Sequence, residues 1–428
     1  MRIQVFQSDK GDCLLLTAAD DTRVLVDGGM RSSYSQHVAP ALGRIAREGG
    51  KLDLVYVSHI DQDHISGVLQ LVEDEIAWRV RDFQHSTGNT GFKDPVRARP
   101  PQVKRIWHNA FSDVVRENAG PIEEAVAADA AVLEAGSAER ALAQAERNLA
   151  TSISEGIQLS RRVGSDQLGI PLNEEFGGKL AMVRPERQTL RLGRLRLTVI
   201  GPFQRDLEKL RKEWNEWLQA HKTALDRLRS RMRADAERLG AGELERFRNA
   251  IEQRAAELGE RDRVTTPNLA SLMLLAEEDG RTLLLTGDGH SEDILRGLEA
   301  AGRLEDGAGH FGVLKVQHHG SEHNIDADFC RKVTADHYVF CANGEHENPD
   351  LRVVETIVRS RVDPRRRGDH ADAGRRFKLW FNSSSTASED ERGRAHMAKV
   401  EELVDRLARD SHEQLRFAFL DRSHFVVR

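Results

Sequence analysis

The sequence predicts an α/β fold of the α+β type, in which two sheets are sandwiched between helices. Short apolar runs typical of buried strands alternate with segments of helical periodicity in both halves of the chain. Mixed strands with interleaved helices favour a layered architecture, with helices covering the outer faces of the sheets. Several strands also end on an acidic residue or a histidine beside glycine, and this recurrence indicates one shared site at the strand ends.

The predicted elements follow from apolar spacing. The first half contains strand-like runs near residues 3–7, 13–18, 22–27, 54–58 and 103–107. Helices are predicted over residues 36–47, where Val38, Leu42 and Ile45 recur at helical spacing, and after Gly67. The second half contains strand-like runs near residues 194–200, 270–276, 282–286, 312–317, 337–341, 377–381 and 415–420.

Two charged segments interrupt this plan and are predicted to be long helical insertions. Residues 116–165 are rich in alanine and glutamate, with apolar residues at helical spacing. Residues 204–262 are denser in charge, and Gly240-Ala241-Gly242 breaks their apolar stripe, which predicts a helical hairpin. We expect one domain over residues 1–428, in which residues 350–428 form a C-terminal extension that completes the second half.

The most informative run is His59-Ile60-Asp61-Gln62-Asp63-His64, which follows the apolar strand 54–57 after a single serine. Imidazole and carboxylate are ligands of divalent ions, and this run holds both. A solvated acidic turn beside two histidines is the alternative for this run alone. Comparable strand ends are Asp27-Gly28-Gly29, Thr286-Gly287-Asp288 and His318-His319-Gly320-Ser321. One shared metal centre explains them together.

In this order the motifs resemble those of the metallo-β-lactamase superfamily, which implies a four-layer αββα sandwich with long helical insertions. The branch that the chain resembles most contains the hydrolase domain of the competence protein ComEC and the phosphorylcholine esterases. That branch also has an early Gly-Asp, here Gly11-Asp12, and an Asn-x-x-Ser-Leu strand opening, here residues 268–272. The resemblance runs from residue 11 to about residue 349.

The resemblance implies two divalent ions, zinc or manganese. Their ligands would be His59 and Asp61 for the first ion, Asp63 and His64 for the second, Asp288 between the two, and one of His318 and His319 on the second. Two ions about 3.5–4 Å apart can clamp a phosphoryl centre and activate a water, so no serine or cysteine nucleophile is required. The other histidine of the pair would bind the developing oxyanion or protonate the leaving group.

The chain departs from the commoner superfamily pattern at two positions. Asp61 stands where many members have a histidine, and this harder ligand favours manganese or magnesium while leaving zinc open. The usual third histidine before the Thr-Gly-Asp strand is missing, and Asn268 stands in a position to replace it as a weak ligand or a substrate contact.

Further residues are assigned around this centre. Catalytic roles are expected for Asp63, His318 and His319, and for His346, which lies where relatives have a Gly-His-Pro turn. Substrate contacts or support of the ligands are expected from Asp12, Asp27, His108, Asn268 and His323. For His346, a position in a surface loop is the alternative, and for His108 a structural role is the equal alternative. The remaining histidines, such as His370, His396 and His412, are expected at the surface.

The composition favours a cytoplasmic protein without a membrane segment. Lys+Arg 63 and Asp+Glu 69 nearly balance, so the net charge neither favours nor excludes nucleic acid. The N-terminus becomes acidic too early for a signal peptide, and no run approaches the roughly 20 apolar residues of a membrane span. The cysteines Cys13, Cys330 and Cys341 suit a reducing compartment, and Cys13 is expected in the core.

Three functions are weighed. The leading one is a metal-dependent phosphodiesterase or nuclease acting on DNA or RNA, because the motifs resemble ComEC and because Arg227, Arg229, Arg231 and Arg233 could follow a phosphate backbone. A solvated helix face is the alternative for these arginines. The second function is hydrolysis of a small phosphoester, cyclic nucleotide or carboxylic ester at the same centre. The third is a non-catalytic module whose helical insertions bind a protein partner, which the intact metal motifs disfavour.

Overall fold

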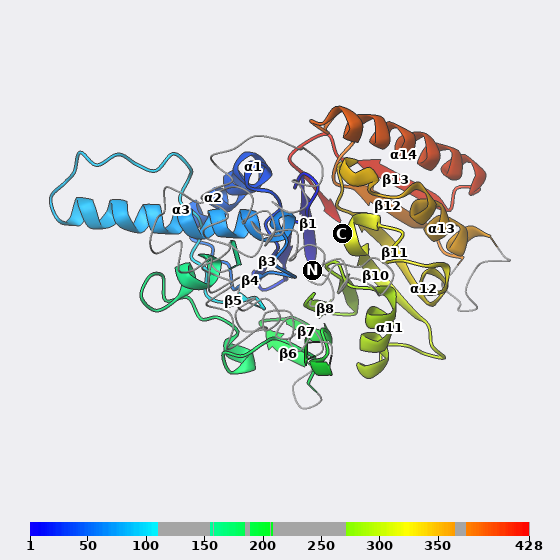
Figure 1. Cartoon of the computed structure of the whole chain (residues 1–428), viewed down its shortest axis with the longest axis horizontal. Helices are drawn as coiled ribbons and strands as arrows, with labels where there is room; N and C mark the ends of the chain where they lie inside the picture. The colour runs from blue at the N-terminus through cyan, green and yellow to red at the C-terminus, as the bar shows by residue number, and fades with distance from the viewer. Residues whose placement is uncertain are drawn as a thin grey trace, which may run out of the picture.

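The protein folds as two mixed sheets with helices on their outer faces, and the predicted fold class is confirmed (Figure 1). A computed structural model describes residues 1–109, 155–156, 158–184, 189–205, 207–208, 271–363 and 374–427. Most of both predicted helical insertions, Asn268, and the four arginines between residues 227 and 233 therefore lie outside the described residues.

The first sheet has six strands in the order β14-β1-β2-β3-β4-β5. These strands are β1 Arg2–Phe6, β2 Leu14–Thr17, β3 Arg23–Val26, β4 Leu54–Tyr56, β5 Ile106–Trp107 and β14 His424–Val427. β3, β4 and β5 run parallel, whereas β14, β1, β2 and β3 pair antiparallel. The last strand of the chain thus lies beside the first.

The second sheet has eight strands in the order β13-β12-β11-β10-β9-β8-β7-β6. They are β6 Thr189–Leu192, β7 Leu195–Gly201, β8 Met273–Glu278, β9 Arg281–Leu285, β10 Gly309–Lys315, β11 Val333–Phe340, β12 Phe377–Phe381 and β13 Leu415–Phe419. The run from β9 to β13 is parallel, and β6 to β9 pair antiparallel.

The apolar strands are buried on both faces, which explains their continuous apolar sequences. In β4, Leu54 and Tyr56 enter the core between the two sheets, and Val55 enters the core under the helices. In β9, Leu283 and Leu285 enter the inner core, and Leu284 packs outward. This alternation follows from the two-residue period of side chains along a strand.

The helices cover the outer faces of the sheets in two groups. The first group comprises α1 Arg31–Ser33, the π-helical turn η1 Tyr34–Val38, α2 Ala39–Arg47 and α3 Gln62–Ser86, and the end of α3 extends beyond the body of the molecule (Figure 1). The second group comprises α11 Ser291–Ala300, α12 Ala327–Lys332, α13 Leu351–Val362 and α14 Glu391–Asp410. Within the described ranges, no helix combines the length and the apolarity needed to cross a bilayer.

Several expectations are corrected. The strands β6 and β14 and the helices α11, α12, α13 and α14 had not been predicted. The helix expected after Gly67 begins earlier, at Gln62, so the metal motif itself starts α3. His396 was expected at the surface but is buried, and its Nε2 lies 3.0 Å from the Pro349 carbonyl oxygen.

Candidate metal centre

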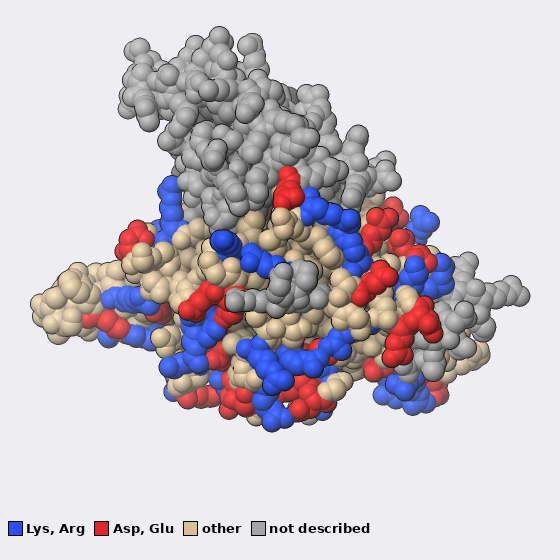
Figure 2. Space-filling model, turned by 90° about the horizontal axis from the view of Figure 1, so that it is seen from below, with Lys and Arg blue, Asp and Glu red and all other residues tan. Residues whose placement is uncertain are grey.

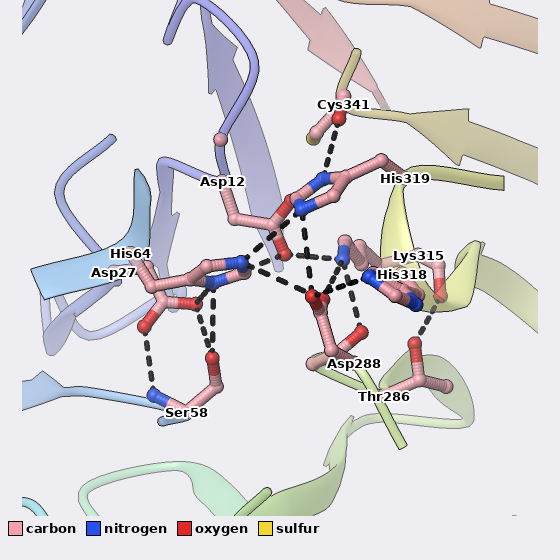
Figure 3. A network of polar contacts seen from close by, with 12 residues as sticks. Asp12, Asp27, Ser58, His64, Thr286, Asp288, Lys315, His318, His319 and Cys341 are labelled. Atoms are coloured by element: carbon pink, nitrogen blue, oxygen red, sulfur yellow. Dashed lines mark hydrogen bonds and ion pairs between the residues drawn. The ribbon is translucent and has the colours of Figure 1, made fainter. Parts of the chain in front are cut away.

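The predicted metal ligands meet where strands from both sheets end (Figure 3). His59 follows β4, Asp61 caps α3, and Asp63 and His64 lie in the first turn of that helix. Asp288 follows β9, while His318 and His319 form the turn η5 Gln317–Gly320 after β10. The carboxyl ends of neighbouring parallel strands share one edge of a sheet, which is why motifs far apart in the sequence converge.

The side chains of Asp63, His64, Asp288 and His319, here called the His64 set, direct ligand-type atoms toward one another. His64 Nε2 lies 3.4 Å from His319 Nε2, 3.5 Å from Asp288 Oδ1 and 3.9 Å from Asp63 Oδ2. His319 Nε2 lies 3.0 Å from Asp63 Oδ2 and 3.5 Å from Asp288 Oδ2. Ligand atoms of one tetrahedral zinc ion lie about 3.3 Å apart, so the His64 set has the spacing of a four-ligand site.

The His59 set, comprising His59, Asp61, Asp288 and His318, adjoins it through the shared Asp288. His59 Nε2 lies 3.5 Å from Asp61 Oδ2 and 3.5 Å from Asp288 Oδ2. His318 Nε2 lies 3.6 Å from the same Asp288 oxygen. The two neighbouring histidines therefore serve different sets: His319 faces His64, and His318 faces Asp288 on the His59 side.

Each of the four histidine rings has an acceptor on its Nδ1 side. These contacts are His59 to Ser58 Oγ at 3.1 Å, His64 to Asp27 Oδ2 at 3.0 Å, His318 to Asn324 Oδ1 at 2.5 Å and His319 to the Cys341 carbonyl at 2.8 Å. Ser58 Oγ donates to Asp27 Oδ2 at 2.8 Å, so it is free to accept from His59. A hydrogen on Nδ1 leaves the Nε2 lone pair of the neutral ring directed at the centre, as in a metal ligand.

Buried atoms at the centre also fit a cation. His59 Nε2 and Asp288 Oδ1 are buried, and neither has a hydrogen-bond partner within the described part of the chain. The ligand-type atoms of His59, His64 and Asp288 all lie within 4.8 Å of one another. An ion between them would satisfy these atoms and offset the negative charge of the carboxylates, so the residues present fit a divalent metal.

The turn that carries the paired histidines is strained. His318 and His319 both have left-handed backbones, with φ of 45° and 57°. A left-handed backbone costs a residue other than glycine about 1–3 kcal/mol, and residues with such strained backbones cluster at functional sites. The His318 amide donates to the Gly287 carbonyl at 3.1 Å, so this turn is held against the loop that carries Asp288.

Lys315 is a buried cation beside the centre that the sequence analysis did not single out. Its ammonium pairs with Asp12, donates to the Gly287 carbonyl at 3.1 Å, and lies 3.8 Å from Asp288 Oδ1 (Figure 3). Burial opposes its charge, but Asp12 and Asp288 raise the pKa of Lys315 above its ordinary value. The signal was present in the sequence as one lysine inside the apolar run 313–316.

Asp12 supports the ligands from behind. Its Oδ1 lies 3.5 Å from His319 Nδ1, and its Oδ2 lies 3.8 Å from His64 Nδ1, opposite the ring nitrogens that face the centre. Burial opposes ionisation, but Lys315 and His64 lower the pKa of the Asp12 carboxyl to about 2. Asp12 is therefore a permanent anion that holds both rings. Asp27 likewise accepts from the Ser58 amide at 2.7 Å, as expected for a residue that orients the metal loop.

The carboxylates hold protons on two of the rings in the metal-free protein. Burial alone would lower the pKa of His64, but Asp288, Asp12 and Asp63 raise it well above its ordinary value. The pKa of His319 is raised against burial in the same way, first by Asp288. Burial raises the pKa of Asp63, but His64 and His319 lower it overall. A bound cation would replace these protons.

Other predicted site residues lie apart from the convergence. The His346 side chain is 62% exposed and sits 3.6 Å from Glu345, so the structure does not bring it to the metal sets. His323 is exposed on the turn after η5. His108 is fully buried, and neither ring nitrogen has a hydrogen-bond partner among the described residues.

One comparison with known proteins agrees with the fold. The sequence model of the metallo-beta-lactamase superfamily matches residues 9–120, which include the metal motif of α3. The two mixed sheets with helices on their outer faces are consistent with the metallo-β-lactamase sandwich fold. Similarity to the crystal structure of Zn(2+)-bound PqqB from Methylobacterium extorquens covers 100% of both chains, at 11% sequence identity and a TM-score of 0.35. A likeness at this level carries no argument about function. No curated protein matches the chain.

Proposed function

We propose that this protein is a metal-dependent hydrolase that cleaves a phosphoester with a metal-activated water. The observation that carries the proposal is the common direction of four histidine rings, each of which presents Nε2 to a centre shared with buried carboxylates. A divalent ion at each set, zinc or manganese, would supply Lewis acidity and a water of lowered pKa.

The residues of the centre are assigned to two ion sites. Asp63, His64, Asp288 and His319 would hold one ion, and the His59 set would hold the other. Asn324 accepts from His318 Nδ1 and donates to the Asp288 carbonyl at 2.9 Å, which fixes the ring as an acceptor at Nε2. His318 is therefore proposed as a ligand of the His59 set, rather than as the group that protonates the leaving oxygen.

Among phosphoesters, we favour a small substrate over a nucleic acid. Lys and Arg side chains are interspersed with Asp and Glu on the face drawn in Figure 2, without a continuous basic stripe among the described residues there. The ammonium group of Lys315, which lies beside the centre, is already ion-paired with Asp12 and is not available to a phosphate backbone. A ComEC-like nuclease remains the second candidate, favoured by the sequence motifs and dependent on the arginines outside the described residues.

The test is turnover of a small chromogenic phosphodiester and a carboxylic ester by the full chain, with the metal content measured on the same sample. Asp63→Asn removes a ligand charge from the His64 set without changing the side-chain volume, and we expect it to lower phosphodiester turnover by at least 100-fold. The matched control is Asp405→Asn, on the exposed face of α14, which is expected to retain wild-type turnover.

The same assay decides between the substrates. Turnover of the small phosphodiester and no cleavage of a single-stranded oligonucleotide supports the proposal as stated. Cleavage of the oligonucleotide at a higher kcat/KM than the small phosphodiester would favour the nuclease instead. The proposed hydrolase is overturned if protein purified without chelator contains no metal and takes up none from zinc or manganese solutions.

A further inference from the structure

The end of α3 projects from the body of the molecule, together with the segment that returns beside it (Figure 1). Residues 77–99 are here called the α3 arm. Three contacts tie the returning segment to the helix: His85 Nε2 lies 2.9 Å from the Phe92 carbonyl oxygen, Arg81 donates to Asp94 at 2.7 Å, and Trp78 Nε1 donates to the Arg97 carbonyl at 3.1 Å. The two parts of the arm therefore run antiparallel, and the arm is held in shape by its own contacts.

The arm carries a cluster of exposed apolar side chains, namely Val80, Phe83, Phe92 and Val96. In the described part of the chain, every large apolar side chain that is exposed belongs to this cluster, and Phe83 is 64% exposed. The contacts between the helix and the returning segment confine the cluster to about two helical turns, or about 11 Å. The projecting end, at the left of Figure 2, is accordingly drawn mostly in tan. Single exposed apolar residues are ordinary, but a cluster of them marks an interaction surface.

The exposed stripe continues a face of α3 that is buried nearer the body. Leu69 and Val72 lie in the core under the helices, and Ile76 packs partly against that core. Val80 and Phe83 follow at the same spacing of three or four residues, so they lie on the same face of the helix. This face leaves the core without losing its apolar character. Its last two turns lack the apolar cover that the core gives to the earlier ones.

The charges of the arm disfavour a strongly charged partner. Over residues 74–99, five basic and four acidic side chains leave a net charge of +1. Each arginine of this range pairs with a carboxylate: Arg79 with Glu75 at 2.9 Å, Arg81 with Asp94 at 2.7 Å, Arg97 with Asp74 at 2.8 Å, and Arg99 with Asp82 at 2.6 Å. Nucleic acids and anionic lipids are bound by cations that are free to meet phosphate. Two nearly neutral arms, by contrast, can meet each other without net repulsion.

We propose that the α3 arm is a dimerisation surface whose partner is a second copy of this chain. Val80 and Phe83 of one copy pack on the same two residues of the other about a two-fold axis, which presents one patch to itself. Because the arm projects, the two bodies stay apart in this pair (Figure 1). Phe83 lies about 28 Å along the helix from His64, so the metal centre stays outside the interface. The inference does not depend on the proposed hydrolysis.

The first test is the oligomeric state of the full chain, measured by analytical ultracentrifugation over a wide range of concentrations with chelator present. Because the patch is small, we expect a weak dimer that dissociates on dilution. The double variant Val80→Asn and Phe83→Asn is expected to weaken the association at least 10-fold. Both side chains are exposed, so its circular dichroism and thermal unfolding are expected to match the wild type. Phe83→Leu keeps an apolar side chain at the same position and is the matched control, expected to dimerise.

The second test places a cysteine on the arm. The cysteines Cys13, Cys330 and Cys341 are all buried, so an engineered surface thiol is the one available for oxidation between copies. Val80→Cys is expected to form a disulfide-linked dimer under mild oxidation at a rate at least 10-fold above that of Asp405→Cys. Asp405 lies on the exposed face of α14, away from the arm, and controls for random collision.

Three outcomes overturn the inference: a monomer at every concentration, a dimer that the double variant leaves unchanged, or equal crosslinking of the two cysteine variants. A monomer that binds anionic phospholipid vesicles, and loses this binding in the double variant, also overturns it. That result would assign the arm to a membrane surface instead.

Discussion

At the scale of single residues, the centre depends on which nitrogen of each histidine carries a proton. Acceptors on the Nδ1 side orient the rings of His59, His64, His318 and His319, and Nε2 faces the centre. In the metal-free protein the nearby carboxylates keep His64 and His319 protonated above their ordinary range. A metal ion has to displace these protons, so metal binding and pH are linked.

We therefore expect metal affinity to rise with pH through the neutral range. Because the carboxylates raise the pKa values of His64 and His319 well above their ordinary value, protons compete with the metal at a higher pH than they would at free imidazoles. Zinc affinity measured by competition with a chelating dye at pH 6, 7 and 8 is expected to change by more than 10-fold per pH unit at the acidic end. An affinity independent of pH in this range would contradict the assignment of these rings as ligands.

His108 shows the opposite behaviour, because no carboxylate among the described residues offsets its burial. Burial lowers the pKa of this ring from 6.5 to about 4. Between these values the unfolded chain binds a proton that the folded protein does not. The stability contributed by neutral His108 is therefore complete above pH 6.5 and is lost as the pH falls towards 4, by about 2 kcal/mol at pH 5.

Replacing the His108 imidazole with a side chain that does not titrate removes this loss of stability at acidic pH. We expect His108→Gln to reduce the decrease in unfolding free energy between pH 7.5 and pH 5 by about 2 kcal/mol relative to the wild type, as measured by urea denaturation in chelator. His412→Gln, at an exposed position, is the control and is expected to keep the wild-type decrease. An unchanged pH dependence in the His108 variant would show that the ring is not buried in its neutral form.

At the scale of elements, the position of α3 is set by a close approach of two glycines. A Cβ on Gly67 would lie 2.0 Å from the Gly28 carbonyl oxygen, and a Cβ on Gly28 would lie 2.3 Å from the Val68 amide nitrogen. The second turn of α3 can thus rest directly on the loop after β3. That contact places Asp63 and His64 next to Asp27, which holds the His64 ring.

Gly67→Ala is expected to displace the helix. Overpacking against backbone atoms typically costs about 1–3 kcal/mol, so we expect an unfolding free energy lower by that amount and a zinc affinity lower by at least 10-fold. Gly91→Ala is the matched control, since a Cβ there would meet no atom within 4 Å. Wild-type stability and wild-type zinc affinity in the Gly67 variant would show that this contact does not position the metal loop.

At the scale of the whole molecule, the centre exists only where the two halves meet. The first half supplies the ligands of the α3 motif, and the second supplies Asp288 and the paired histidines. The strand β14 returns from the end of the chain to pair with β1. Asn382 joins the halves as well: it donates to Ser8 Oγ at 2.8 Å and accepts from the Ala342 amide at 2.8 Å. Metal affinity therefore reports on the docking of the halves.

The sequence by itself determined the layered fold class, most of the strands and the set of ligand-type residues. These features are local: a buried strand needs a continuous apolar run, and a metal loop concentrates histidine and carboxylate within a few positions. His59, His64 and Asp288 could be named because each directly follows or lies close to an apolar strand.

Only the tertiary structure decided how those residues are grouped. It assigned His319 to the His64 set and His318 to the His59 set, paired Lys315 with Asp12, and left His346 at the surface. It also brought together loops whose residues lie more than 300 positions apart, as in the hydrogen bond between Asn343 and Asp9. Such contacts depend on the packing of one sheet against the other, and the spacing of residues along the chain carries no record of it.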